Sequence, residues 1–392
     1  MIPAWVERDL EAVAAADALR SLRPLEGPTA ARVRVEGREL RNFSSNDYLG
    51  LAADPRLAEA AGAAARRWGS GAGASRLITG TLGIHGELEE ALAALKGAET
   101  ALLFSTGYQA NLGLLQALAP EGVILSDELN HASLVDGCRL ARAQVAVYRH
   151  GDTNHLADLL SQHADAPRTI VATDGVFSMD GDLAPLPALL AAAEPRGGLV
   201  IVDDAHATGV LGAGRGTAHH LGVDPGRVVH MGTLGKALGS FGAFVAGPAP
   251  IRDLLVNRAR SLIYTTAPPP PAVGAALAAL GVLRDEPWRL GALERNGRAL
   301  REGLRALGFR VSEAPTPIVP LVLGGNRRTL RWSRGLWERG FWVHPIRPPT
   351  VPEGTSRLRL TVTAAHTAAD LAGLLQALAE VAREEDADDL AR

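Results

Sequence analysis

A lysine enclosed by glycines is the feature of this sequence with the clearest chemical meaning. Lys236 lies in GTLGKALG (232–239), directly after the apolar segment VVHMG (228–232). Such a segment predicts a buried strand, and ligands bind at the carboxyl ends of the strands in parallel sheets. Apolar surroundings favour a neutral amine, which can form a Schiff base with a carbonyl compound. Lys236 is therefore a candidate nucleophile.

A second reactive group ends the apolar run GLVIVDDAHATG (198–209), which contains Asp203, Asp204 and His206. A metal site is one interpretation, although no third ligand follows at helical spacing. The alternative is a heteroaromatic cofactor, with an acid at its ring nitrogen and a histidine at its phenolic oxygen. Pyridoxal 5'-phosphate (PLP) needs such an acid, because a protonated ring nitrogen lets the ring accept electrons.

A helix start follows the apolar segment ALLF (101–104). The sequence STGYQANLGLL (105–115) places Ser and Thr at the expected N-cap, with Gly107 and Tyr108 next. Free backbone N–H groups at a helix start bind phosphate well. An ordinary helix cap and a phosphate site are both consistent with this segment.

Two more polar residues follow predicted strands. His131 lies in ELNHASLVDG (128–137) and is either structural or able to stack on a planar ring. Ser178 lies in DGVFSMDGD (174–182) and taken alone indicates only a loop. Because all these motifs follow successive strands, a single phosphorylated cofactor explains them together.

The glycine-rich segment GSGAGA (69–74) offers a competing interpretation as a dinucleotide site. That fingerprint requires a strand before it, whereas LAEAAGAAARRWG (57–69) has a helical pattern. A P-loop is excluded, because Ala237 stands where Ser or Thr would hold magnesium. The segment is better interpreted as a mobile active-site loop, and a nucleotide-binding oxidoreductase stays as the rival class.

Short apolar segments alternating with helical patterns indicate the fold class. Consecutive apolar positions are typical of strands covered by helices on both faces. We expect α/β architecture with a mostly parallel, seven-stranded sheet. Its predicted strands are 101–104, 122–126, 144–148, 169–173, 198–204, 228–232 and 242–247.

The pattern of predicted helices and strands changes after TTAPPPP (265–271). Helical stretches there lead into shorter strands at 318–323, 341–344 and 356–362 and a last helix near 367–383. We therefore predict three parts. They are an N-terminal helix and hairpin (1–45), a large cofactor-binding domain (46–265) and a smaller C-terminal α+β domain (266–392). The last residues, REEDADDLAR, are expected to be frayed.

Composition narrows the class of protein. The 392 residues carry a net charge of -3, which gives no strong field for nucleic acid or an acidic membrane. No apolar run reaches the roughly 18 residues of a membrane span. The single cysteine, Cys138, excludes a disulfide framework and a cysteine-based zinc site. We expect a cytoplasmic protein without metal, nucleic-acid or membrane partners.

At these motifs the sequence resembles the α-oxoamine synthases, fold-type I PLP-dependent transferases, over essentially the whole chain. The matching segments are FSSNDYLGL (43–51), STGYQAN, LNHASL, DGVFSMDGDLAPL, VDDAHATGVLGAGRG, GTLGKALG, IYTTAPPP (263–270) and IRPPTVPEGTSRLRLTVTAAHT (346–367). The resemblance implies PLP as cofactor and a homodimer with a shared active site, in which Ser75 and Thr265 reach the neighbour's cofactor.

The resemblance also implies roles for single residues. Lys236 would carry the cofactor as a Schiff base and shuttle the α-proton, Asp203 would bind the ring nitrogen, and His206 the ring 3-oxygen. His131 would stack on the ring and contact substrate. Gly107, Tyr108, Ser178 and Thr233 would contact the cofactor, and Arg20 and Thr350 the substrate.

Within the family, ADALR (16–20), FSSNDYLGL and IRPPTVP favour the branch that condenses L-alanine with a pimeloyl thioester in biotin synthesis, losing carbon dioxide. GTLGKALG and SFGAF (240–244) are closer to the branch that uses glycine and acetyl-CoA, and Ala207 stands where glycine is usual. The sequence leaves open whether CoA or acyl carrier protein delivers the acyl group. Arg20 is the candidate cation for the pimeloyl carboxylate. Arg347 is the second choice, because it could instead hold the carboxylate of the amino acid or brace its loop.

Overall fold

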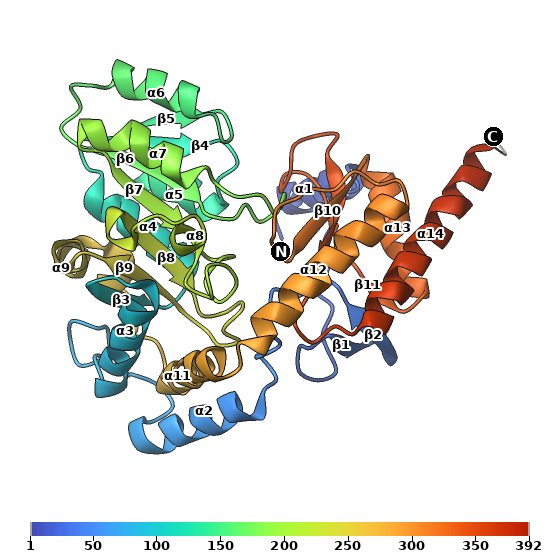
Figure 1. Ribbon diagram of the computed structural model, residues 1–392, viewed down its shortest axis with the longest axis horizontal. Coiled ribbons are helices and arrows are strands. Elements are labelled where there is room, and N and C mark those ends of the chain that lie inside the picture. The colour runs from blue at the N-terminus through green and yellow to red at the C-terminus, as the bar shows by residue number, and fades with distance from the viewer. Residues whose placement is uncertain (1, 391–392) are drawn as a thin grey trace. The chain divides into compact units, whose positions relative to one another are not determined.

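The structure is a computed structural model that describes residues 2–390. The chain forms two compact units, which Figure 1 draws as ribbons. The larger unit contains Asp47–Ser178 and Asp182–Gly291. The smaller unit contains residues 2–46, Met179–Gly181 and residues 292–390.

A seven-stranded sheet forms the centre of the larger unit, as the sequence predicted, in the order β3-β9-β8-β7-β6-β4-β5. Strand β9 is antiparallel to both of its neighbours, and all the other pairs are parallel. The strands are β3 (Thr100–Phe104), β4 (Val123–Asp127), β5 (Gln144–Tyr148), β6 (Thr169–Asp174), β7 (Leu199–Asp203), β8 (Val228–Thr233) and β9 (Ala243–Gly247).

Helices cover both faces of this sheet, which explains why its strands are apolar at consecutive positions. In β7, Val200 and Val202 pack in one core with α6, α7 and α8, while Ile201 packs in the opposite core with α4, α5 and α9. Figure 1 shows α6 and α7 in front of the sheet. The larger unit's helices are α2 (Pro55–Trp68), α3 (Gly83–Lys96), α4 (Gly107–Leu118), α5 (Ala132–Leu140), α6 (Thr153–Gln162), α7 (Leu186–Ala193), α8 (Thr217–His220), α9 (Ala249–Arg258), α10 (Arg260–Ile263) and α11 (Pro270–Asp285).

Polar residues gather where the parallel strands end. Asp127, Asp174, Asp203 and Thr233 are the last residues of β4, β6, β7 and β8. The chain leaves β4 toward β5 on one side and returns to β6 on the other. Such a switch of direction opens a crevice for ligands at the carboxyl edge of a sheet.

Two three-stranded sheets form the smaller unit, β1-β2-β11 and β10-β13-β12. Their strands are β1 (Arg32–Val35), β2 (Arg38–Asn42), β10 (Ile318–Gly324), β11 (Phe341–Trp342), β12 (Pro345–Ile346) and β13 (Ser356–Thr361). The helices are α1 (Ala4–Ala15), α12 (Trp288–Ala306), which begins in the larger unit, α13 (Asn326–Glu338) and α14 (Ala368–Leu390). Within residues 2–390, every helix is too short or too polar to cross a bilayer.

The observed grouping differs from the three predicted parts. The N-terminal helix and hairpin belong to the same unit as the C-terminal strands. The second boundary falls after Gly291 rather than Thr265, because α11 packs against α2 and α3. The prolines of TTAPPPP therefore start a helix, where a missing N–H costs nothing, rather than mark a linker.

The two terminal helices differ in how they end. The first helix ends at Ala15, because Asp17 adopts a left-handed conformation (φ 52°) and Ala18 N bonds back to Val13 O, so that Arg20 lies beyond the helix. The last helix extends past the predicted end at 383 to Leu390. Arg328 binds Glu385 there, at 2.7 Å, and secures the added turn. Residues 391–392 of the segment expected to be frayed lie outside the described residues.

Candidate active site

A cavity of about 210 Å³ lies at the carboxyl ends of β6, β7 and β8. All the residues predicted to bind the cofactor line it: Gly107, Tyr108, His131, Ser178, Asp203, His206, Thr233 and Lys236. Its other lining residues are Ser133, Asp174, Val176, Ala205 and Met231. A more open hollow at the amino ends of β4 and β5 contains none of the predicted residues. The structure thus brings the cofactor candidates into one pocket.

Lys236 faces the histidine of the DDAHATG segment. Its Nζ lies 2.8 Å from His206 Nε2, and His206 Nδ1 lies 2.6 Å from the hydroxyl of Tyr48. Tyr48 is fully buried, so its hydroxyl is a fixed support. A partner on the second ring nitrogen fixes the orientation of an imidazole. Tyr48 therefore determines how His206 faces Lys236.

Asp203 is held by the helix that follows β3. Asn111 of α4 donates its Nδ2 to Asp203 Oδ2 at 2.7 Å and to Ser133 Oγ at 2.8 Å. The Ala205 N–H donates to Asp203 Oδ1 at 2.9 Å. Asp203 is only 4% exposed, and it lines the pocket. These contacts fix a carboxylate that a ligand in the pocket can reach.

His131 is the N-cap of α5 at the edge of the pocket. Its Nδ1 lies 2.7 Å from Ser133 Oγ and accepts the Ser133 N–H at 3.2 Å, which locks the ring against the helix start. Burial lowers the pKa of the imidazole; Asp203 opposes this shift, and Lys236 adds to it. The ring is therefore neutral at neutral pH, as suits a group that stacks on a planar ligand.

A second carboxyl group, Asp174, enters the pocket beside Asp203. The two residues are paired across β6 and β7. Asp174 Oδ2 accepts the His131 N–H at 3.2 Å, whereas Oδ1 is buried without a partner among the described residues. Burial raises the pKa of Asp174 well above its usual range, and the charge of Asp203 raises it further. The pocket therefore favours a protonated Asp174.

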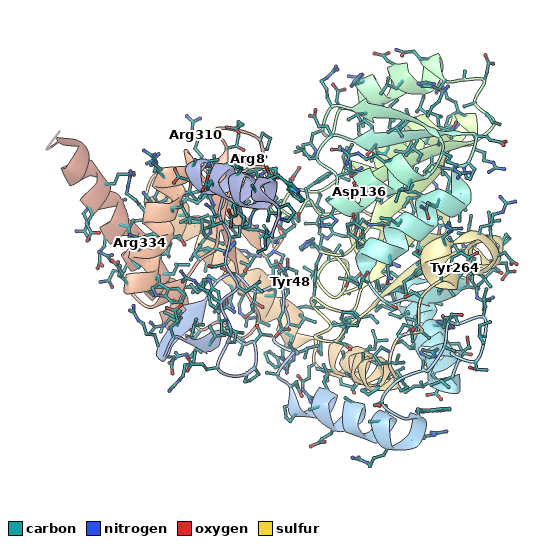
Figure 2. The ribbon with its side chains drawn as sticks, turned by 180° about the vertical axis from the view of Figure 1, so that it is seen from behind. Arg8, Tyr48, Asp136, Tyr264, Arg310 and Arg334 are labelled. Atoms are coloured by element: carbon teal, nitrogen blue, oxygen red, sulfur yellow. The ribbon has the colours of Figure 1, made fainter. Side chains whose placement is uncertain are left out.

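The first turn of α4 forms the phosphate candidate. Thr106 caps it by accepting the Gln109 N–H at 3.1 Å, so Gly107 and Tyr108 begin the helix at the pocket wall. The Tyr108 hydroxyl donates to Asp136, labelled in Figure 2. Opposite, Thr233 donates to Gly242 O at 3.1 Å and accepts the Gly235 N–H at 3.2 Å.

The structure corrects the metal interpretation of the two adjacent aspartates. Asp204 is absent from the pocket wall; its Oδ2 lies 2.8 Å from Lys96 Nζ, and both side chains are fully buried. Successive positions of a strand point to opposite faces, so Asp203 and Asp204 cannot share one ion here. Among the residues that the structure describes, no cluster of three His, Cys, Asp or Glu suits a metal.

The glycine-rich segment 69–74 does not have the setting of a dinucleotide site. It follows helix α2, which ends at Trp68, and precedes α3, which begins at Gly83. The strand that must lead into a dinucleotide-binding turn is replaced by a helix.

The predicted substrate contacts Arg20 and Thr350 both belong to the smaller unit and are exposed. Arg347 is only 9% exposed and donates to the backbone carbonyls of Asp17 and Leu19, beside Arg20. Burial lowers the pKa of Arg347, and the charge of Arg20 lowers it further. The two cations named for the pimeloyl carboxylate are thus neighbours.

The sequence did not single out two residues that line the pocket, Ser133 and Asp174, or two that support its wall, Tyr48 and Asn111. Tyr48, Asn111, Ser133 and Asp174 all lie inside quoted motifs. A signal existed for Asp174, because it ends a strand as Asp203 does. None existed for Asn111 or Tyr48, whose partners are 92 and 158 residues away along the chain.

The donor set fits PLP. A carboxylate for the ring nitrogen, a neutral imidazole for the ring face, a lysine amine and a capped helix start meet in one small cavity. The buried Oδ1 atom of Asp174, which lines the pocket, has no partner among the described residues, as expected where a polar ligand completes the hydrogen bonding. His206, which lies beside Lys236, is suited to bind a phenolic oxygen.

Comparison with known proteins agrees with this geometry. Residues 38–378 match the family model of class I and II aminotransferases. The chain is 52% identical over 379 residues to the 8-amino-7-oxononanoate synthase of Anaeromyxobacter dehalogenans, covering 96% of this chain and 95% of that protein. It is 50% identical over 370 residues to the enzyme of the same name from Geobacter sulfurreducens, covering 93% and 94%.

Solved structures match over the same length. A serine palmitoyltransferase variant from S. paucimobilis with a bound PLP–myriocin aldimine is 30% identical, with a TM-score of 0.91 and 97% of each chain covered. An 8-amino-7-oxononanoate synthase from Francisella tularensis is 27% identical, with a TM-score of 0.77, covering 88% of this chain and 98% of that one.

Proposed function

The chain belongs to the class I and II aminotransferase family and, within it, to the α-oxoamine synthases, and we propose that its pocket joins L-alanine to a pimeloyl thioester. A carbon–carbon bond forms between the alanine Cα and the thioester carbonyl carbon, and the carbon–sulfur bond breaks to release the thiol carrier. Carbon dioxide leaves, and the product is 8-amino-7-oxononanoate. The enzyme is PLP-dependent and acts in biotin synthesis.

One observation carries the chemical part of the proposal. Lys236 Nζ lies 2.8 Å from His206 Nε2 in the pocket that also contains the buried carboxylate of Asp203. A reactive amine, a group for a phenolic oxygen and an acid for a ring nitrogen are the requirements of PLP chemistry. When bound, PLP accepts the electron pair left on Cα after loss of a proton or of carbon dioxide.

Lys236 has two tasks in this proposal. Its Nζ would hold the cofactor covalently, and as a free amine it would take the proton from Cα of alanine and later return one. His206 lies within hydrogen-bond distance of this amine and orients it. Tyr48 keeps His206 in place.

Asp203 would hold the ring nitrogen protonated, and Asn111 fixes the Asp203 carboxylate. His131, neutral and locked to Ser133, would stack on the ring and contact substrate. The N–H groups of the first turn of α4, at Gly107 and Tyr108, would bind the phosphate with Thr233. Ser178 would complete the cofactor contacts.

The pimeloyl chain ends in a carboxylate that an acetyl group lacks, so its site needs a cation. We assign this role to Arg20, with Thr350 as a second substrate contact. Arg347 supports Arg20 by binding the backbone of the same segment. We expect Arg20→Ala to weaken use of the pimeloyl thioester by about 1.5–3 kcal/mol and to leave alanine binding unchanged. Equal losses with acetyl-CoA would assign Arg20 to the thiol carrier or the fold.

The larger unit exposes apolar side chains beside the two residues predicted to reach a neighbour's cofactor. Leu77 and Ile78 follow Ser75, and Tyr264, labelled in Figure 2, precedes Thr265; Ile78 and Tyr264 are 76% and 72% exposed. Such exposure favours a covered surface. We assign this surface to a homodimer, so light scattering should give twice the 41.0 kDa of one chain. The single cysteine and the biotin-pathway reaction support a cytoplasmic location for this dimer.

A two-substrate assay tests the reaction. We expect turnover of L-alanine with a pimeloyl thioester, as CoA or acyl carrier protein conjugate, to exceed turnover of glycine with acetyl-CoA. The opposite preference would favour glycine C-acetyltransferase, the alternative that Ala207 and GTLGKALG leave open. A colourless protein that binds NAD would instead support an oxidoreductase.

A further inference from the structure

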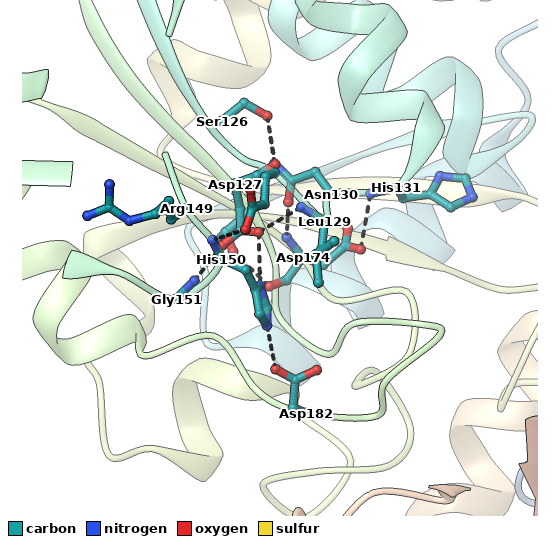
Figure 3. Close-up of polar contacts among 12 residues, drawn as sticks. Ser126, Asp127, Leu129, Asn130, His131, Arg149, His150, Gly151, Asp174 and Asp182 are labelled. Atoms are coloured by element: carbon teal, nitrogen blue, oxygen red, sulfur yellow. Dashed lines mark hydrogen bonds and ion pairs between the residues drawn. The ribbon is translucent and has the colours of Figure 1, made fainter. Parts of the chain in front are cut away.

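A histidine outside the pocket is held between two carboxylates. His150 follows β5, and its Nδ1 lies 3.0 Å from Asp127 Oδ1 while its Nε2 lies 2.7 Å from Asp182 Oδ2, as Figure 3 shows. Neither carboxylate lines the pocket, and His150 itself is 25% exposed. The group is therefore separate from the cofactor contacts.

The two acceptors determine the charge of the ring. A carboxylate can only accept a hydrogen bond, so both ring nitrogens must donate, and His150 is an imidazolium. The bonds to Asp127 and Asp182 outweigh burial and raise the pKa of His150 to about 10. The other charges nearby are already engaged: Glu128 accepts the His150 N–H at 2.8 Å, and Arg149 binds Asp152 at 2.7 Å.

One side of this cluster holds the turn that carries Ser178. The Phe177 ring meets the His150 ring edge-on, at 4.4 Å between centroids and 84° between planes. The Phe177 N–H donates to Asp182 O at 3.0 Å and closes the turn. His150 therefore contacts both residues that bracket Ser178, one through its ring face and one through a charged hydrogen bond.

The other side of the cluster is anchored to the sheet. Asp127, the last residue of β4, also accepts the N–H groups of Leu129 at 2.9 Å and Gly151 at 3.0 Å. Asp127 is buried, so it is a fixed support rather than a mobile partner. The ends of β4 and β5 thus hold the Ser178 turn through the imidazolium of His150.

We propose that His150 is a positioning residue for the cofactor pocket, an imidazolium clamp that fixes the Ser178 turn to the carboxyl edge of the sheet so that Ser178 faces PLP. This inference rests on the proposed function, because it requires PLP in the pocket. His150 touches neither the cofactor nor the substrate and acts only through Ser178.

A double-mutant cycle tests the clamp. PLP is removed by dialysis and titrated back by absorbance into the wild type, His150→Gln, Ser178→Ala and the double variant. We expect His150→Gln to weaken PLP binding about tenfold in the wild-type background, as for other contacts that orient a binding side chain. In the Ser178→Ala background we expect less than a twofold effect, because the residue that the clamp positions is gone.

A control and a second variant keep the test decisive. His163→Gln removes an imidazole at the end of α6 that contacts no carboxylate among the described side chains, and it should leave PLP binding unchanged. If His150→Gln does not fold, Asp182→Asn replaces it, since this change removes the charge and keeps the size. Equal losses in both backgrounds, or no loss in the wild-type background, would overturn the clamp. Failure of the unmodified protein to bind PLP would instead overturn the proposed function.

Discussion

Asp203 and Asp204 are neighbours in the chain, yet they lie in two regions with opposite properties. Asp203 opens into the pocket, where polar atoms are left for a ligand. Asp204 points into a closed cluster with Lys96, His230 and Thr217, in which Lys96 supplies a cation and Thr217 a backbone N–H for the Asp204 carboxylate.

The closed cluster leaves no room for a ligand. A Cβ atom on Gly216 would overlap both the Asp204 carboxylate and Lys96 Nζ, and Gly216 needs its positive φ of 111°. Burial alone would raise the pKa of Asp204, but the Lys96 ammonium and His230 outweigh it and lower the pKa far below its usual range. A charge held in this way stabilises the turn that carries Asp203 and His206 but performs no chemistry.

In the open pocket the pKa of a buried carboxyl group shifts in the opposite direction. Asp174 is buried at the pocket wall, and burial and the charge of Asp203 raise its pKa, although Lys236 opposes this shift. Its Oδ1 and that of Asn111 have no partner among the described residues. Comparison of the two regions indicates that a buried carboxyl group with an oxygen left for a ligand marks the reactive site, whereas a carboxylate held in an ion pair marks its scaffold.

The largest effect is expected from removing the reactive amine. Lys236→Ala should abolish turnover and covalent attachment of PLP, because no other amine lines the pocket. Borohydride reduction followed by mass spectrometry measures the attachment. A lysine–PLP adduct at normal yield in this variant would contradict the assignment, and an unchanged melting temperature is the control.

Breaking the closed cluster should affect stability instead. Lys96→Met leaves the charge of Asp204 buried without its cation, and we expect a loss of about 3–5 kcal/mol in the free energy of unfolding. Because the pKa of Asp204 is lowered in the folded protein, the pair stabilises above the pKa of the unfolded carboxyl, about 4, and is lost in stronger acid. Urea denaturation at pH 7 measures the loss; a change below 1 kcal/mol would contradict the comparison.

The clamp at His150 should give a smaller, pH-dependent effect. The pKa of His150 is raised to about 10 in the folded protein, so its stabilisation is complete below the unfolded value of about 6.5 and is lost as the pH rises through 10. We expect His150→Gln to be about 1–2 kcal/mol less stable than the wild type at pH 6 and nearly equal to it above pH 10. A pH-independent difference in urea denaturation would argue against the imidazolium.

The smallest effect is expected at Asp174. If the pocket keeps this carboxyl protonated, an amide of the same shape is a good replacement, because Asn also lacks charge. Asp174→Asn should change PLP affinity by less than about threefold, whereas Asp203→Asn, the matched change across the strand pair, should alter the bound cofactor. A tenfold loss of affinity in Asp174→Asn would mean that its negative charge is needed.

The sequence predicted the pocket well because strand ends are encoded locally. An apolar run followed by a polar motif is enough to assign Lys236, Asp203, His206 and His131 to one edge of the sheet. Their supports could not be predicted in this way. Asn111 and Tyr48 reach partners that lie far along the chain, and only the packed fold brings them close.

The boundaries between the two units were harder to predict, because they also depend on packing. The prolines near 268–271 indicate a break in the chain, but whether α11 belongs to the first or second unit depends on its packing against α2. The position of Arg20 depends on a single left-handed residue, Asp17, which follows the end of the first helix at Ala15. The pattern of residues does not determine non-local packing or the backbone conformation of a single residue.

One matched pair of variants tests the central contrast most directly. Asp203→Asn and Asp204→Asn are made, and each is measured for the free energy of unfolding and for the condensation rate per folded, PLP-loaded molecule. Asp203→Asn should fold with nearly wild-type stability and lose at least about a hundredfold in rate, because the ring nitrogen loses its acid. Asp204→Asn should lose stability and keep most of the rate per folded molecule. The reverse pattern, or equal losses in both properties, would contradict the account.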